Sequence, residues 1–167
     1  FVFRNALIRD ATYALLTDED RRIGHRRAAE YLESAGSQEP LAIAEHLVKG
    51  ALPDRAAAYF LRAGLRSFEC NDLDEAFRRG TRGLEFAEPG QTQGELRTLL
   101  TMAHCWRSEL QAAYEQSIQA WPLLAPGSRW ESSVLFHGMW AALVTGYEQD
   151  FANMAAALCT FQPAGPD

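Results

Sequence analysis

The stretch FLRAGLRSFECNDLDEAFRRGTRGLEFAEP, residues 60–89, holds two segments with helical periodicity joined by a short polar turn. In the first segment Phe60, Gly64 and Phe68 recur every four residues, which is the spacing of one face of an α-helix. Asp72 precedes Glu75 by three residues, a pairing of N-cap and N3 side chains that is typical of a helix start. We therefore predict a helix hairpin, with helices over residues 54–70 and 73–87.

The same start signal recurs along the chain. The five pairs are Asp72 with Glu75, Thr92 with Glu95, Ser108 with Gln111, Ser128 with Glu131, and Thr145 with Glu148. The first residues of alternate pairs lie 36 or 37 positions apart, and Pro-Gly steps at 89–90 and 126–127 separate the hairpins. A helix pair repeating at that period predicts an all-α fold, a right-handed α-solenoid of about nine helices.

Glycine inside a predicted helix also needs a physical reason. Gly64 would cost about 1 kcal/mol relative to alanine in a helix interior. We expect a close approach of the two helices at Gly64 and Ala76 to offset this cost. Gly138, two repeats further along, is expected to serve the same purpose.

Residues 60–89 resemble a tetratricopeptide repeat. The matching residues are Phe60, Ala63 and Gly64 in the first helix, Leu73 and Ala76 in the second, and Pro89 at the end. Ser67, Gly80 and Gly83 depart from that pattern, and in the last repeat Gly138 and Tyr147 fit it whereas Asp150 does not. The resemblance implies tetratricopeptide-like helix hairpins over residues 54–161.

The first ninety residues carry a second resemblance. Its phrases are Phe3-Arg4, Ala6 to Ala11, Tyr13, His25 to Arg27, Ala29-Glu30, Ala44 to Leu47, Arg55 to Ala57 and Arg62 to Gly64, with Asn5 in place of a usual histidine. Together they resemble the junction in large bacterial signalling proteins where a P-loop ATPase with a winged-helix unit passes into a tetratricopeptide arm. Such families join the ATPase to kinase, cyclase or DNA-binding modules.

That resemblance implies a division of the chain. Residues 1–16 would be the remnant of an upstream winged-helix unit, with the opening Phe-Val-Phe as its last strand. Residues 17–53 would be linking helices, 54–161 the repeats, and 162–167 a polar tail. Any ATPase would then lie upstream, since the sequence has no Gly-rich phosphate-binding loop.

Charge and composition limit the classes of function that the chain can have. The chain has 167 residues and a net charge of −6, which argues against a nucleic-acid partner. Its basic segment RRIGHRR (21–27) follows three acids and a capping Thr17, so we interpret it as a solvated helix. Apolar runs are too short to span a membrane. Three widely spaced cysteines favour a reducing, cytoplasmic location.

The sequence offers no catalytic constellation. His104, Cys105, His137 and Cys159 could be gathered into a metal site, but none has the spacing of known ligand motifs. His46 is interpreted as a packing or capping residue near Gly50. We predict that the chain is not an enzyme and needs no cofactor or metal.

Four tryptophans fall within 35 residues. We expect Trp106 and Trp140 in the core between helices, because they lie on apolar helical stripes. Trp121 and Trp130 flank a loop and are the better candidates for a partner contact, since tryptophan is enriched at binding hot spots.

The predicted function is a non-catalytic protein-interaction or scaffold module, the sensor arm of a larger signalling ATPase. In tetratricopeptide repeats the first helix of each pair lines a concave groove. At the matching positions of this sequence, the resemblance implies these groove residues: Leu61, Leu65, Phe68, Leu100, His104, Arg107, Leu135 and Met139. Such a groove would take an amphipathic or extended apolar peptide, with Arg107 binding a carboxylate. The alternatives are an effector-binding or autoinhibitory arm acting on the ATPase, and self-association through exposed solenoid ends.

Overall fold

The computed structural model describes residues 6–164, with side chains from residue 10 onward, and this part of the chain contains nine α-helices. They are α1 (Ala6–Ala14), α2 (Asp18–Ser34), α3 (Pro40–Lys49), α4 (Pro53–Glu69), α5 (Leu73–Leu84), α6 (Gln91–Trp106), α7 (Leu110–Ala120), α8 (Arg129–Thr145) and α9 (Glu148–Cys159), with a 3₁₀ turn, η1 (Trp121–Leu123), after α7. The predicted all-α class and helix number are confirmed. The predicted Phe-Val-Phe strand lies outside the described residues.

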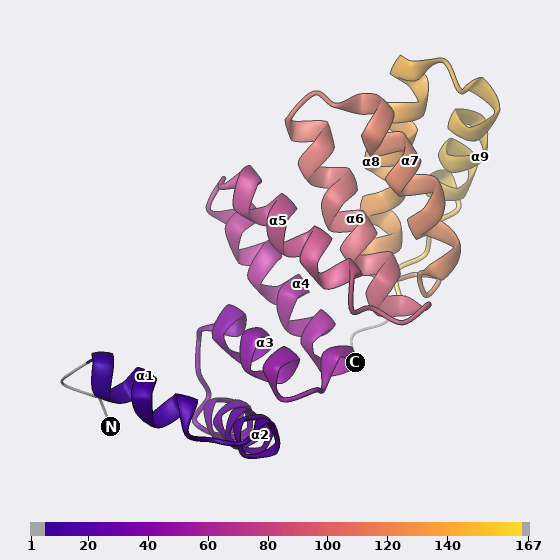
Figure 1. The fold of residues 1–167 in the computed structure, drawn as a ribbon. Coiled ribbons are helices and arrows are strands. Elements are labelled where there is room, and N and C mark those ends of the chain that lie inside the picture. Colours follow the sequence, from indigo (N-terminus) through magenta and orange to yellow (C-terminus); the bar gives the residue numbers. More distant parts are fainter. Residues whose placement is uncertain (1–5, 165–167) are drawn as a thin grey trace.

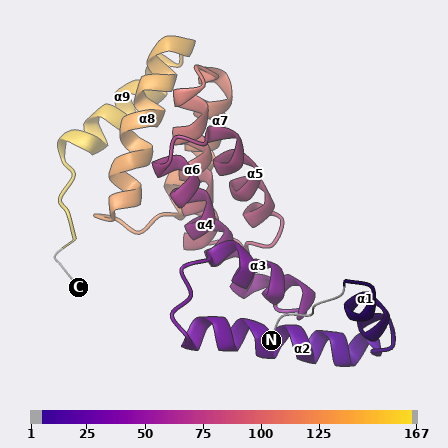
Figure 2. The ribbon, with the colours of Figure 1, turned by 90° about the vertical axis from the view of Figure 1, so that its left-hand side faces the viewer.

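The helices pack in chain order. From α2 onward each helix contacts the next, and α4, α6 and α8 also contact one another in sequence. Figure 1 and Figure 2 place α1 and α2 at one end of this array and α8 and α9 at the other. The starts of α4, α6 and α8 are 38 residues apart, and those of α5, α7 and α9 are 37 and 38 apart. The packing is therefore repeat-like, with a period slightly longer than predicted.

The turns inside the hairpins α4–α5, α6–α7 and α8–α9 are built alike. Each passes through one residue with positive φ, namely Asn71, Ser108 or Gly146. The next backbone N–H donates to a carbonyl five residues earlier: Asp72 to Ser67, Glu109 to His104, and Tyr147 to Ala142, each at 2.9 Å. This hydrogen bond is the 6→1 bond of a Schellman helix end. The turns thus define equivalent positions in the three hairpins.

Two of the five predicted helix starts have the expected cap. The side chains of Asp72 and Ser128 accept hydrogen bonds from the backbone N–H groups of Glu75 and Glu131, both at 3.1 Å. Thr17 and Asp20 form a complete capping box at the start of α2. These side chains satisfy N–H groups that have no partner within the helix.

The other three predicted caps are wrong. Helix α6 begins at Gln91 after Gly90, so Thr92 is already helical. Ser108 is the positive-φ residue that ends the preceding helix, and the N-cap of α7 is Glu109. Thr145 lies in the last turn of α8, where its hydroxyl donates to the Ala141 carbonyl at 2.6 Å. In the last two cases the polar residue belongs to a helix end rather than a start.

Glycines let α6 pack tightly on the hairpin before it. A Cβ atom at Gly64 would lie 2.6 Å from Leu99 Cδ2 and 3.5 Å from the Ala76 carbonyl oxygen. The close approach predicted at Gly64 is confirmed, although α6 comes nearer than α5. Gly80 and Gly83, which depart from the tetratricopeptide pattern, accommodate Leu100 and Leu96 of α6 in the same way.

Gly138 of α8 serves a similar purpose at the other end of the array. A Cβ there would lie 2.7 Å from Ser117 Cβ of α7 and 3.0 Å from Met154 Sδ of α9. Both neighbouring helices therefore approach α8 at this residue, and the prediction for Gly138 is confirmed.

The prediction for the tryptophans is wrong. Trp130 is 8% exposed within the central core, and Trp121 packs against the same core. Trp106 and Trp140 are 66% and 53% exposed. Helix α8 is apolar on every side, so its sequence does not indicate which stripe faces the core.

Candidate functional site

The predicted groove residues lie mostly in the core. Leu61, Leu100, His104 and Leu135 are at most 8% exposed. Leu65 and Phe68 are half-buried and pack against the central core, Met139 is half-buried, and Arg107 is exposed. The structure thus distributes these residues along the contacts between helices and does not bring them together on one open surface.

Arg107 is already paired within the chain. Its guanidinium lies 3.0 Å from an Asp74 carboxylate oxygen and 2.9 Å from a Glu109 carboxylate oxygen. His104 Nδ1 lies 2.7 Å from the other Glu109 oxygen, and this hydrogen bond, with the contribution of Arg107, lowers the pKa of Glu109. These groups join α5 to the α6–α7 turn. We therefore interpret Arg107 as a residue that stabilises the fold.

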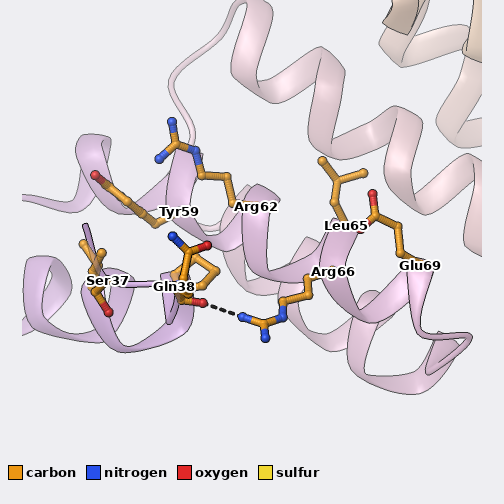
Figure 3. Close-up of a pocket in the computed structure, with 9 residues that line it drawn as sticks. Ser37, Gln38, Tyr59, Arg62, Leu65, Arg66 and Glu69 are labelled. Carbon is orange, nitrogen blue, oxygen red and sulfur yellow. Dashed lines mark hydrogen bonds between the residues drawn. The ribbon is translucent and has the colours of Figure 1, made fainter. Parts of the chain in front are cut away.

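An open cavity lies instead between the start of α3 and the exposed side of α4. Its volume is about 630 Å³, within the range of small-ligand and peptide pockets. Its lining residues come from the α2–α3 turn, α3 and α4 and are Ser37, Gln38, Pro40, Ile43, Tyr59, Arg62, Leu65, Arg66 and Glu69. Figure 3 shows Tyr59, Arg62, Leu65, Arg66 and Glu69 following one another along α4. We call this cavity the α3–α4 groove.

The two arginines of the groove have different surroundings. Arg66 donates to the Gln38 backbone carbonyl, drawn as a dashed line in Figure 3, and its Nη1 lies 3.9 Å from Glu39. Arg62 places its guanidinium carbon 5.1 Å from the centre of the Tyr59 ring, a cation–π arrangement. No ion pair joins Arg62 to a carboxylate in the described part of the chain. Its charge is available to a ligand.

Tyr59 is held in place by a carboxylate of α2. Its hydroxyl donates to Glu33 Oε1 at 2.9 Å, and Arg55 Nη2 lies 2.8 Å from the same carboxylate. Burial, followed by this hydrogen bond, raises the pKa of Tyr59, so the phenol remains neutral. The ring is thus a fixed support for Arg62, while Leu65 and Pro40 add apolar surface.

A histidine pair lies outside this groove, between α2 and α3. His25 Nδ1 and His46 Nδ1 are 2.8 Å apart, and the Tyr13 hydroxyl lies 2.9 Å from His25 Nε2. Burial lowers the pKa of both histidines, and Lys49 lowers both further. The prediction of a packing role for His46 agrees with this contact. The pair connects α1, α2 and α3.

The described residues contain no group of three or more His, Cys, Asp or Glu side chains placed to hold a metal ion. Among the helices of residues 6–164, none combines the length and apolar character needed to cross a membrane. Comparisons of the chain with protein-family models, with curated proteins and with solved structures found no match.

Proposed function

We propose that this chain is a non-catalytic protein-interaction module, a right-handed α-solenoid of tetratricopeptide-like hairpins. The observation that carries the proposal is the repeat of helix pairs that start 37 or 38 residues apart and stack through α4, α6 and α8. Stacked hairpins expose an extended surface that suits the binding of a protein segment. The resemblance of residues 1–90 extends the proposal to the sensor arm of a larger signalling ATPase.

The ligand we propose is an extended peptide segment that carries a carboxylate next to an apolar side chain. Arg62 supplies a guanidinium that is oriented by Tyr59 and has no carboxylate partner in the described part of the chain. Arginine binds carboxylates with directed, charge-assisted hydrogen bonds. Leu65 and Pro40 would contact the apolar side chain. The carboxylate supplies orientation and the apolar contact supplies most of the buried surface.

A random peptide library displayed on phage tests this proposal without a known partner. We expect selection on the wild-type chain to enrich peptides with Asp or Glu beside Leu, Ile or Phe. Arg62→Glu should weaken binding of an enriched peptide by about tenfold or more, the loss expected for one hydrogen bond between charged groups. Binding should also weaken as salt is added, because the attraction is between charges at the surface.

Arg129→Glu is the matched control. Arg129 is exposed at the start of α8 and, like Arg62, places its guanidinium carbon 5.1 Å from the centre of an aromatic ring, that of Trp130, and the substitution changes the net charge by the same amount. If both variants lose affinity equally, binding depends on overall charge and the groove is not the site. Enriched peptides without an acidic residue would also contradict the proposal.

A further inference from the structure

Equivalent positions in the three hairpins form one continuous line of contacts. In each hairpin these positions lie ten, six and three residues before the residue with positive φ, and they belong to α4, α6 and α8. They are Leu61, Leu65 and Phe68 in α4; Thr98, Met102 and Cys105 in α6; and Phe136, Trp140 and Leu143 in α8. The first two sets face the next layer of helices, and Leu65 among them also lines the α3–α4 groove.

The first two sets are covered by that next layer. Leu61, Leu65 and Phe68 of α4 belong to the cluster that contains Leu96 and Leu99 of α6. Thr98 of α6 is fully buried. Cys105, also of α6, packs against Ala141 and Ala142 of α8. These positions are therefore the surface through which one hairpin stacks on the next.

The third set is uncovered. Phe136, Trp140 and Leu143 are 57%, 53% and 52% exposed, and Val144 beside them is 53% exposed. Figure 1 and Figure 2 place α8 in the last layer of the array. We call these four residues the α8 face. It is a stacking surface without a neighbour in the structure.

The α8 face suits a second copy of the same chain. Residues 132–147 contain no Asp, Glu, Lys or Arg, although the whole chain carries a net charge of −6. Two copies can therefore bring these faces together without placing like charges in contact. With α8 antiparallel across a two-fold axis near Trp140, Phe136 of each copy would lie beside Val144 of the other.

The available area is sufficient for such a contact. An aromatic side chain buries roughly 150–250 Å². At the exposed fractions of the α8 face, two copies would bury on the order of 1,000 Å², which is where specific interfaces begin. This area predicts a reversible dimer rather than a permanent one.

We propose that the chain self-associates as a dimer through the α8 face, with Trp140 at its centre. This inference goes beyond peptide binding, because it concerns a different surface at the opposite end of the array. The dimer would cover, between two molecules, the positions that the next hairpin covers in α4 and α6.

Sedimentation velocity of the purified chain over a concentration series tests the inference. We expect the mass to rise with concentration from the 18.6 kDa of one chain toward twice that value. Trp140→Glu should raise the dissociation constant of the dimer at least about 30-fold, because a central aromatic residue is replaced by a charge at a hot spot. Leu143→Arg should do the same while making the net charge less negative.

Two control variants test whether the dimer contact lies at the α8 face. Tyr31→Glu introduces the same charge at an aromatic residue that is 70% exposed on α2, and Leu15→Glu does so at the far end of the array. Both should dimerise as the wild type does, and circular dichroism should show that every variant is folded. A wild-type chain that stays monomeric throughout the series overturns the inference. So does a dimer that survives both α8 substitutions or is lost in Leu15→Glu.

Discussion

At the scale of single residues, the fold depends on glycines, whose missing side chains leave room for residues of the neighbouring helix. Leu96, Leu99 and Leu100 of α6 occupy space that is open only because Gly83, Gly64 and Gly80 lack a Cβ atom. Glycine is costly inside a helix, so three glycines in one hairpin indicate that the packing they allow outweighs that cost. Gly64 could be interpreted from the sequence, but the leucine that contacts it could not, because Leu99 lies 35 residues further along the chain.

Gly64→Val should therefore lower the free energy of unfolding by about 1–3 kcal/mol, the usual cost of overfilling a packed core. Gly24→Val is the matched control, because no atom lies within 4 Å of a Cβ at Gly24 in α2. That variant should be as stable as the wild type or slightly more so, since valine is a better helix former than glycine. Urea denaturation measures both, and equal effects would contradict the packing described.

The histidine pair predicts how stability depends on pH. Burial lowers the pKa of His25 and His46 in the folded chain, so the unfolded chain binds more protons below pH 6.5. The contribution of the pair to stability should be largest above pH 6.5 and fall as the pH drops from 6.5 toward the lowered pKa values. Lys49 adds to this effect, and Glu45 opposes it at His46.

Thermal unfolding between pH 7.5 and pH 5 measures this dependence. His46→Gln should flatten the loss of stability relative to the wild type, whereas His137→Gln in α8, away from the pair, should not. A wild-type profile that His46→Gln leaves unchanged would show that the pair does not contribute.

At the scale of elements, helix ends decide what the sequence could predict. The hairpin at 54–87 was predictable because its two apolar stripes and the Asp72 cap agree, although α5 ends at Leu84, three residues earlier than expected. Ser108 and Thr145 resemble N-caps in sequence, but a Schellman end is made by backbone groups and carries no fixed side-chain signal. The period was consequently predicted one or two residues too short.

Ser108→Gly distinguishes these two roles. At a positive-φ position glycine avoids the strain of a Cβ atom, so the variant should be more stable than the wild type by roughly 0.5–1 kcal/mol. Ser128→Ala should instead cost about 1 kcal/mol, because Ser128 is a true N-cap. Urea denaturation tests both, and a loss of stability in Ser108→Gly would support the N-cap interpretation.

At the scale of the whole molecule, the proposed binding surfaces were the least predictable feature. Six of the eight predicted groove residues are apolar, and the stacked hairpins bury the apolar stripes on which they lie, wholly or in part. The α3–α4 groove has a weak signal in sequence, the Arg62 and Arg66 pair around Leu65. Its depth depends on how the α2–α3 turn approaches α4, which no local pattern encodes. The exposure of the α8 face likewise follows only from the order of the layers.

The central claim is that a peptide segment binds the chain along the α3–α4 groove. The most direct measurement is an amide NMR titration of the wild-type chain with an acidic peptide enriched by selection. We predict chemical-shift changes concentrated in residues 37–43 and along α4 around Tyr59, Arg62 and Arg66, and absent in Arg62→Glu. Changes confined to α8 and α9, or spread evenly over the array, would contradict the account.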